Sequence, residues 1–451
     1  MTPDSTTIAA DAAGPSLPVP GDASVPSSPP VRVLLAALTI VLMAFPLVLR
    51  GFGDPKLSFD YVTIIFPVDI ALALLLLTGA VPVARRILAR TAGPGTTLWA
   101  LLALVMSLAW VFHPSTRGVH TVFELWGTAV LAGTLAEALA TGFADLVFGT
   151  IAAVAVLESA WATVQLVTGA SLGLQALGED VDPFLRFSSA AAAPMGSTVH
   201  IYVLAGFALV AAGALAWRAT TSARPLGWLI AAGLAVMPVG FTYSRAGLAG
   251  FILLVAGFAI EALRRRAGGR RAAAAVLALC LGAGVPAAVW SAGWTNRADQ
   301  TTSARNGAQL TTERTRLIHE AAAQISAHPA TGVGPGRYVI ALKDRYKVET
   351  DPVVKIFKPV HNLVLLAGAE GGILALIVMA TLFVALAWRS LAAGPIAAGI
   401  YLAYLPFCML DHFPYSFPQG LVVTAIWLGV LDVAARRRPL LREAAVDDVP
   451  V

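Results

Sequence analysis

The stretch Gly371-Gly-Ile-Leu-Ala-Leu-Ile-Val-Met-Ala-Thr-Leu-Phe-Val-Ala-Leu-Ala-Trp388 contains no charged residue. It suits the hydrocarbon core of a bilayer, which is ~30 Å thick and takes about 20 apolar residues per helix. The same pattern recurs along the chain, and the twelve runs occupy residues 32–50, 61–83, 97–112, 118–140, 144–168, 197–217, 226–243, 246–263, 272–290, 361–388, 394–410 and 415–435. The sequence therefore predicts an all-α polytopic membrane protein with about twelve transmembrane helices.

The composition of the 451 residues leads to the same class of protein. Hydrophobic residues make up 57% and charged residues only 13%, whereas a soluble domain carries about 25% charged residues. This leaves too little polar surface for a water-soluble globule of this size. Cys280 and Cys408 both lie in apolar runs, which excludes a disulfide framework and a thiolate zinc site. Only five of the 31 basic residues are lysines, and in a membrane protein an arginine excess indicates loop orientation rather than nucleic-acid binding.

Basic residues in the short loops predict the orientation, because cytoplasmic loops carry an excess of Arg and Lys. With a cytoplasmic N-terminus, the inside segments hold 16 basic residues and the short outside loops hold five. We therefore predict that both termini are cytoplasmic. The predicted segments are a disordered tail at 1–30, nine helices within 31–290, a large extracytoplasmic loop at 291–360, three helices within 361–435 and a second tail at 436–451.

The large loop has a pattern that predicts internal order. Thr311 or Thr312 can cap a helix with Glu313 in its first turn, and His328-Pro329 ends that helix. Between them lies an apolar stripe at helical spacing, formed by Leu317, Ile318, Ala321, Ala322 and Ile325. A tight turn follows, rich in glycine, at 332–336. Loops of this length are usually functional or disordered rather than simple connections.

Two acidic residues, Asp69 and Glu158, fall deep within predicted spans. A charge at the centre of a bilayer costs ~2.5–3.5 kcal/mol or more, so such residues are informative. One interpretation is a hydrogen bond or an ion pair between helices. The other is a proton relay in a transporter, and the sequence leaves both open.

Four residues share the predicted outer boundary of the membrane. Arg245 lies in a hairpin between spans, Arg316 lies on the loop helix, His361 begins a span and Asp411 ends another. Each has an ordinary interpretation alone: an interfacial arginine, a solvated helix pair or a polar cap. Together they suit a diphosphate, because guanidinium groups offer paired donors to phosphate oxygens, and a histidine with a pKa of ~6.5 suits a general base. The loop has no acidic cluster at metal-ligand spacing, so we expect no metal and no cofactor.

Three motifs, in order, resemble the O-antigen ligase and polymerase superfamily. Tyr243-Ser-Arg-Ala-Gly247 is similar to the family's Ser-Arg hairpin. The segment from Thr315-Arg-Leu317 to His328-Pro-Ala-Thr-Gly-Val-Gly-Pro-Gly-Arg-Tyr338 is similar to its arginine-bearing outer helix and glycine turn. His361-Asn-Leu-Val-Leu365 with Glu370-Gly-Gly-Ile-Leu374 is similar to the opening of the next helix. The motifs cover roughly residues 240–375, and the topology agrees elsewhere.

The resemblance implies a glycosyltransferase of the C-type membrane fold that needs neither metal nor nucleotide sugar. Such enzymes take a glycan from a polyprenyl diphosphate carrier, undecaprenyl diphosphate in bacteria, on the outer face of the cytoplasmic membrane. Carried over by motif, Arg245 and Arg316 would hold the diphosphate and His361 would activate or orient the acceptor, while Asp411 matches only a late acidic position. His319-Glu320 stands where the family often has a Trp, which is a departure on the acceptor side.

The sequence leaves open whether the chain is a ligase or a polymerase, and whether the acceptor is a glycan, a lipid or a protein. A transporter or flippase of lipid-linked saccharides is the alternative from another class. It would account better for Asp69 and Glu158, but it would not account for an ordered outer loop in which Arg316 and His361 lie close together.

The predicted orientation is testable with single cysteines in a variant that lacks Cys280 and Cys408. In whole cells we expect an impermeant thiol reagent to label Ala308→Cys, in the large loop, and to leave Ala267→Cys, in a basic loop, unlabelled. This follows from the excess of basic residues on the inside. Labelling of Ala267→Cys alone would show that the orientation is inverted.

Overall fold

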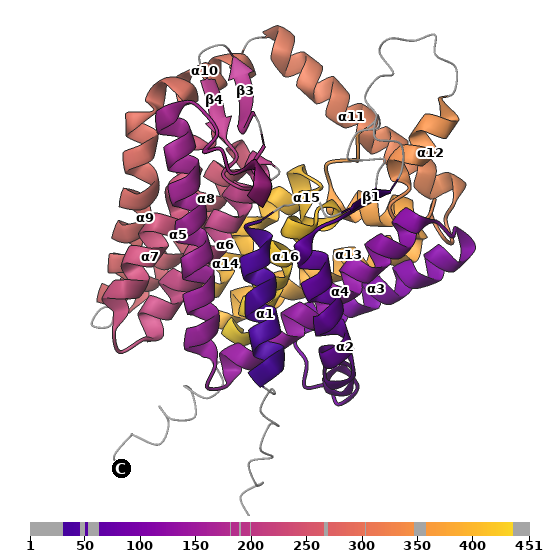
Figure 1. Cartoon of the computed structure of the whole chain (residues 1–451), viewed down its shortest axis with the longest axis horizontal. Coiled ribbons are helices and arrows are strands. Elements are labelled where there is room, and N and C mark those ends of the chain that lie inside the picture. Colours follow the sequence, from indigo (N-terminus) through magenta and orange to yellow (C-terminus); the bar gives the residue numbers. More distant parts are fainter. Residues whose placement is uncertain are drawn as a thin grey trace, which may run out of the picture.

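The structure is a computed structural model, and it describes residues 30–45, 50–52, 63–180, 182–188, 191–198, 200–265, 269–302, 304–346 and 358–435. These residues form a bundle of helices with additional helices across one face (Figure 1). The predicted tails at 1–30 (apart from Pro30) and 436–451 lie outside the described residues, as does Ala267.

Each of the twelve predicted apolar runs corresponds to a helix in the described part of the chain. Eight of these helices have the length and hydropathy to cross a membrane: α2 (Pro67–Leu88), α3 (Pro94–Phe112), α4 (Thr116–Ala140), α5 (Ala144–Thr168), α6 (Ile201–Thr221), α8 (Arg245–Arg264), α9 (Arg270–Val289) and α13 (Leu363–Ala393). Four shorter apolar helices are α1 (Pro30–Met43), α7 (Pro225–Phe241), α14 (Pro395–Leu410) and α16 (Pro418–Ala434). The chain is thus a multi-pass membrane protein.

Two short hairpins depart from the all-α prediction. β1 (Arg50–Phe52) pairs antiparallel with β2 (Thr63–Ile65), and β3 (Phe184–Ser188) pairs with β4 (Ala191–Pro194). The predicted start of the second span at residue 61 is therefore wrong. Pro67 occupies the first turn of α2, and the residues before it include the β-branched pair Thr63 and Ile64, which favours a strand.

Buried charges hold helix ends together on the face that carries the arginine-rich loops, which we call the basic face. The carboxylate of Asp432 on α16 accepts hydrogen bonds from the backbone N–H groups of Gly95 and Thr96 at 2.9 and 3.0 Å, so it caps α3 from a distant part of the sequence. Glu137 on α4 pairs with Arg86 on α2 at 3.2 Å. These acidic residues therefore have structural partners.

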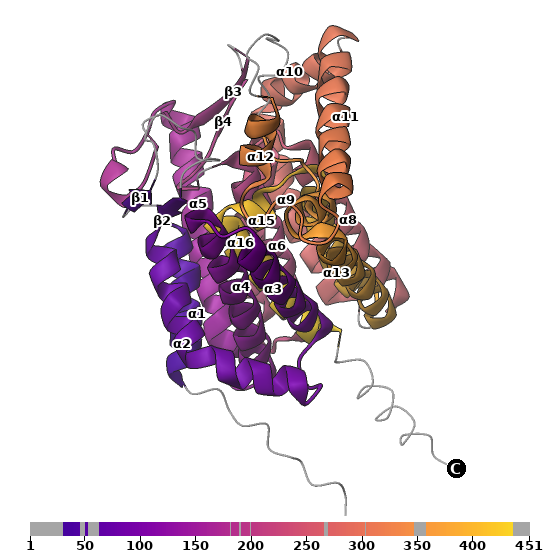
Figure 2. The same cartoon turned by 90° about the vertical axis from the view of Figure 1, so that its right-hand side faces the viewer.

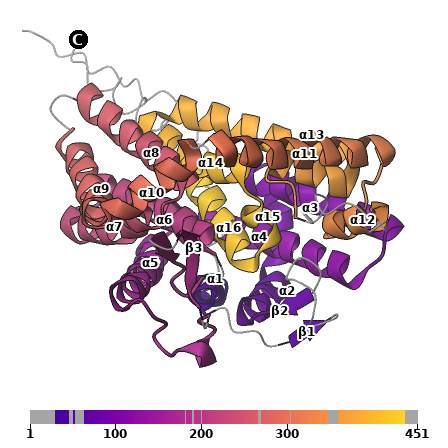
Figure 3. The same cartoon turned by 90° about the horizontal axis from the view of Figure 1, so that it is seen from above.

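The opposite face, which we call the loop-bearing face, is covered by the large predicted loop. It contains α10 (Ser291–Thr302), α11 (Ala304–Ala327) and α12 (Tyr338–Arg345), and α11 lies along α13 (Figures 2 and 3). The predicted helix ends before His328 as expected, but the start predicted at Thr311 or Thr312 is wrong because α11 begins at Ala304. Of the predicted apolar stripe, Leu317 and Ala321 are buried and Ile325 is half-buried, whereas Ile318 and Ala322 are exposed. The stripe begins at Leu317, so it carries no signal for the earlier turns of the helix. A short helix, α15 (Phe413–Ser416), lies nearby between α14 and α16.

The glycine turn after α11 is hydrogen-bonded to α13 at a point where that helix is interrupted. Gly372 has φ 77°, which interrupts the helix and leaves backbone groups without their usual helical partners. The carbonyls of Ala369 and Glu370 accept hydrogen bonds from the N–H groups of Val333 and Gly334 at 2.9 and 3.0 Å. In return, the N–H of Ile373 donates to the carbonyl of Pro329 at 2.8 Å. The turn therefore replaces the missing helical bonds and fixes the end of α11 against α13.

We predict that Gly372→Ala destabilises the protein strongly. A Cβ at this position would lie 2.6 Å from the carbonyl oxygen of Pro329, at a φ that L-residues avoid. Backbone strain of this kind costs about 1–3 kcal/mol before any clash is counted. The measurement is the melting temperature of the purified protein. The matched control is Gly284→Ala in α9, whose Cβ would meet nothing within 4 Å. An equal effect of both variants would contradict the close packing of the glycine turn against the break in α13.

Candidate functional site

His361 and Asp411 meet on the loop-bearing face. Asn362 caps α13 by accepting a hydrogen bond from the N–H of Leu365 at 3.1 Å, which places His361 just before the helix. Asp411 is the residue that ends α14. Side-chain atoms of His361, Asp411 and His412 lie within 4.8 Å of one another. The structure therefore brings together the two predicted catalytic residues, which are distant in sequence.

The imidazole of His361 is neutral at physiological pH. Burial lowers its pKa to about 4, with further contributions from the nearby charges of Arg314 and Lys358. Its Nδ1 atom is buried and has no hydrogen-bond partner among the described residues. Its ring meets that of His412 edge-on, with centroids 5.2 Å apart. A neutral imidazole with an unused nitrogen is suited to accept a hydrogen bond from a hydroxyl group.

Asp411 is 7% exposed, and burial raises the pKa of its carboxyl group to about 6. The carboxylate oxygen Oδ1 accepts hydrogen bonds from the N–H groups of His412 and Phe413 at 2.7 and 3.3 Å, and Arg314 adds a favourable charge. The group is thus ionised at neutral pH, but its pKa lies only slightly below neutral pH, so it can accept a proton readily. That combination suits general base catalysis.

A third histidine, His200, lies beside this pair, and no sequence motif selected it. It precedes α6, where its Nδ1 accepts a hydrogen bond from the N–H of Tyr202 at 3.3 Å. Burial lowers its pKa to about 4, and the neighbouring His361 and Lys358 act in the same direction. Sequence spacing carries no signal for His200, because only the folded bundle brings the start of α6 next to the start of α13.

Arg245 occupies the first turn of α8, as the Ser-Arg motif predicted for a hairpin. The hydroxyl of Ser244 caps the helix by accepting a hydrogen bond from the N–H of Gly247 at 3.0 Å. Tyr243 has φ 51°, an uncommon conformation for a residue with a side chain. A positive charge at a helix N-terminus opposes the helix dipole. Both features are unfavourable for stability, which is typical of residues retained for function.

Arg297, on α10, is a second arginine close to the hairpin that carries Arg245. The sequence analysis did not select it. α10 packs closely on the hairpin: a Cβ at Gly293 would lie 2.1 Å from Cζ of Tyr243, and the indole of Trp294 donates to the carbonyl of Gly240 at 2.7 Å. Burial lowers the pKa of Arg297; its hydrogen bond with Tyr202 opposes this, whereas the charges of Arg245 and Arg314 add to it.

Arg314, rather than Arg316, faces the histidine and aspartate pair. Arg314 is exposed on α11, but its charge acts on both His361 and Asp411 and lowers the pKa of each. The guanidinium of Arg316 instead lies 6.0 Å from the ring centroid of Tyr346. Residues two apart point to different sides of a helix, so the two arginines have different neighbours.

The two deep acidic residues have local partners. Asp69 accepts a hydrogen bond from the N–H of Phe66 at 2.8 Å, at the start of its own helix. Its carboxylate also lies 3.6 Å from Nε2 of His120, whose Nδ1 is 3.4 Å from Glu124. Glu158 accepts hydrogen bonds from the N–H, at 3.1 Å, and the hydroxyl of Ser197. Glu158 thus bonds a residue outside the helices, whereas the contact of Asp69 with His120 joins α2 to α4, so the predicted interaction between helices is observed for Asp69.

Two groups in the described part of the chain have donor sets that could hold a metal ion. One is His361, Asp411 and His412, and the other is Asp69, His120 and Glu124. Neither is visible as a motif in the large loop, because each assembles residues from separate segments. The expectation of metal independence therefore remains a prediction that needs an experimental test.

Residues 230–380 match the sequence model of the O-antigen ligase family (Wzy_C). This range includes the hairpin with Arg245, the three loop helices, the glycine turn and the first part of α13. The match confirms the resemblance that the three motifs indicated. No curated protein matches the chain.

Proposed function

Because this multi-pass membrane protein carries an O-antigen ligase domain at residues 230–380, we propose that it transfers a glycan from a polyprenyl diphosphate carrier to an acceptor hydroxyl. The reaction takes place on the loop-bearing face, which is the outer face of a bacterial cytoplasmic membrane, with both termini cytoplasmic. The bundle is a C-type glycosyltransferase fold with twelve membrane helices. The product contributes to a cell-surface polysaccharide.

One observation carries the proposal: three arginines from separate helices gather beside an acid–base pair. Arg245, Arg297 and Arg314 all lie within electrostatic reach of Tyr202, and so does Asp411. Like charges repel, and a bound anion would offset the repulsion among the three guanidinium groups. A diphosphate offers several negative oxygens, and guanidinium groups bind them through paired, charge-assisted hydrogen bonds.

In the transfer step the acceptor oxygen attacks the anomeric carbon from the side opposite the diphosphate. The bond between this carbon and the diphosphate oxygen breaks, its electron pair leaves with the carrier, and the configuration at the carbon inverts. The three arginines stabilise the charge that grows on the leaving diphosphate. They supply positive charge without a metal ion, so we propose that transfer is metal-independent.

His361 and Asp411 act on the acceptor. The unpartnered Nδ1 of His361 accepts a hydrogen bond from the acceptor hydroxyl and orients it. Asp411 takes the proton, because its pKa of about 6 is closer to neutrality than the value of about 4 for His361. Side-chain atoms of the two groups lie within 4.8 Å, so one hydroxyl can contact both.

The contacts of the deep acids favour an enzyme over a transporter of lipid-linked saccharides. Glu158 is engaged by Ser197, and Asp69 by the backbone at the start of α2.

A ligase and a polymerase use the same chemistry and differ in the acceptor. Incubation of the purified protein with carrier-linked oligosaccharide, with and without candidate acceptors, tests the proposal through release of carrier diphosphate. Activity that EDTA abolishes and magnesium or manganese restores would overturn metal independence.

We predict that Arg314→Ala lowers kcat/KM for the carrier-linked donor by about 10- to 150-fold, because one charge-assisted hydrogen bond contributes about 1.5–3 kcal/mol. Arg314→Lys keeps the charge but loses the paired donors, so it should restore activity only in part. The measurement is the rate of diphosphate release. Arg245→Ala and Arg297→Ala should behave like Arg314→Ala.

The matched control for Arg314 is Arg316→Ala, which removes the same charge from the same helix. The family motif assigns the diphosphate to Arg316, whereas its position beside Tyr346 predicts a smaller effect. A large loss in Arg316→Ala with near-normal turnover in Arg314→Ala would reverse our assignment. Near-normal turnover in all four alanine variants would eliminate the diphosphate clamp.

We also predict an acidic limb in the pH profile of kcat/KM near pH 6. Asp411 is in its basic form above about 6 and is protonated below it, so activity should fall as the pH decreases through this value. Asp411→Asn should lower turnover by about 10²–10⁴-fold and remove the limb. His361→Gln can still accept a hydrogen bond, so it should lose less activity and keep the limb. Retention of the limb in Asp411→Asn would show that another group is the base.

A further inference from the structure

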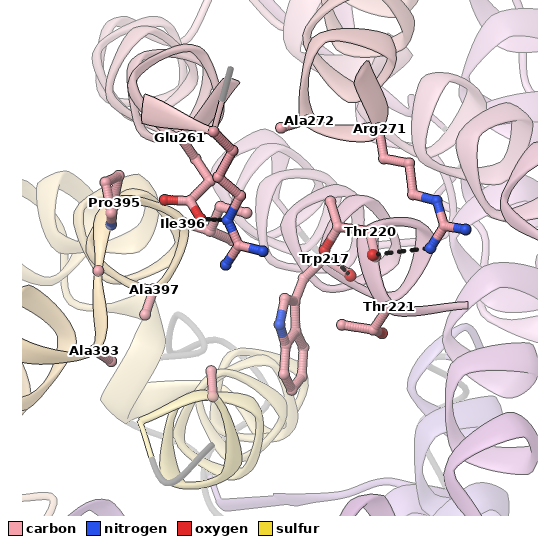
Figure 4. Close-up of a pocket in the computed structure, with 13 residues that line it drawn as sticks. Trp217, Thr220, Thr221, Glu261, Arg271, Ala272, Ala393, Pro395, Ile396 and Ala397 are labelled. Carbon is pink, nitrogen blue, oxygen red and sulfur yellow. Dashed lines mark hydrogen bonds and ion pairs between the residues drawn. The ribbon is translucent and has the colours of Figure 1, made fainter. Parts of the chain in front are cut away.

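A polar cavity lies on the basic face, at the opposite ends of the helices from the candidate active site. Its volume is about 180 Å³, several times the ~30 Å³ that a water molecule occupies in the liquid. The lining residues come from the ends of α6, α8, α13 and α16 and from the starts of α9 and α14 (Figure 4). It is therefore a site built by many elements rather than a gap between two helices.

The charges around this cavity favour an anion. Arg265 pairs with the buried carboxylate of Glu261, which leaves Arg271 as the uncompensated charge among the lining residues. The Nη1 atom of Arg271 donates to the carbonyl of Thr220 at 3.4 Å (Figure 4), and Arg271 forms no ion pair within the described ranges. A guanidinium group beside one neutral carbonyl retains donors for a further acceptor.

The rest of the lining adds polar groups and an apolar side, although the hydroxyls of Thr220 and Thr221 donate to the carbonyls of Trp217 and Arg218 at 2.7 and 3.1 Å. Thr220 and Thr221 contribute hydroxyl groups, Trp217 contributes an indole face, and Ile396 and Ala397 lie in the first turn of α14. No side chain caps the N-terminus of that helix, and the helix dipole there adds a partial positive charge. Trp and Arg at the end of membrane helices are typical of the lipid headgroup region.

We propose that this cavity binds the phosphodiester headgroup of an anionic phospholipid from the leaflet that borders the basic face. One phosphodiester charge matches the single net positive charge of Arg265, Arg271 and Glu261. Basic pockets between transmembrane helices bind such headgroups. The neighbouring surface of α8 is apolar, with Leu263 80% exposed, and it can contact the acyl chains.

The test is native mass spectrometry of the purified full-length protein with phosphatidylglycerol, phosphatidylcholine or inorganic phosphate. We expect the wild type to retain phosphatidylglycerol more strongly than phosphatidylcholine. Arg271→Gln should weaken this retention by about tenfold or more, as expected for loss of a charge-assisted contact. Glu261→Gln releases Arg265 from its ion pair and should strengthen it.

Arg270→Gln is the matched control, because it removes the same charge one residue away and Arg270 does not line the cavity. Equal losses in Arg270→Gln and Arg271→Gln would show only a general surface charge effect and would overturn the proposal. Displacement of the lipid by inorganic phosphate at equal concentration would identify free phosphate as the ligand and overturn the lipid assignment. Glycan transfer is not measured here, so the result is independent of the proposed function.

Discussion

The position of the candidate active site depends on the hydrogen bonds between the broken helix α13 and the glycine turn that follows α11. A continuous helix would use its own carbonyls, and the outer helices would then have no backbone anchor on the bundle. The break at Gly372 releases the carbonyls of Ala369 and Glu370 to the turn, and Pro329 accepts from Ile373 in return. Buried Glu370 strengthens the same junction by accepting a hydrogen bond from the N–H of Tyr338, just after the turn, at 3.4 Å. α11 is thereby held at a fixed height above the start of α13, which is the condition for Arg314 to face His361.

The arginine cluster is assembled at some cost to local stability. Arg245 opposes the dipole of α8, Tyr243 holds an uncommon backbone conformation beside it, and burial disfavours the charge of Arg297. Each cost is offset by packing that does not involve the arginines themselves, such as the contact of Gly293 with Tyr243 and the hydrogen bond of Trp294. A site prepared in this way binds an anion without first reorganising, and such preorganisation is the main source of electrostatic catalysis. The proposed role of the cluster as a diphosphate clamp rests on this argument.

Much of the fold follows from hydropathy alone, because a helix in a bilayer must be apolar along its length. All twelve runs correspond to helices. The C-terminal ends of α11, α14 and α16 lie near their predicted positions. The strand pair before α2 was missed, since an apolar segment of three residues has the same hydropathy in a strand as in a helix. The site was partly predictable: Arg245, His361 and Asp411 stood at one predicted depth, and the structure brings His361 and Asp411 together. His200 and Arg297 were not predictable, because their proximity arises only when α6 and α10 pack beside the hairpin.

Arginine illustrates why composition cannot assign these roles. Arg86 forms an ion pair with buried Glu137 at 3.2 Å and joins α2 to α4, whereas Arg218 pairs with exposed Asp145 at 2.6 Å, a contact that water and salt weaken. Arg314 lies near His361 and Asp411 but forms no ion pair with either within the described ranges, so its charge is available to a ligand. Arg271 lines a cavity with a single neutral partner among the described residues. The same guanidinium group is thus structural where a buried carboxylate neutralises it and is available for binding where none does, and only the tertiary contacts distinguish the two cases.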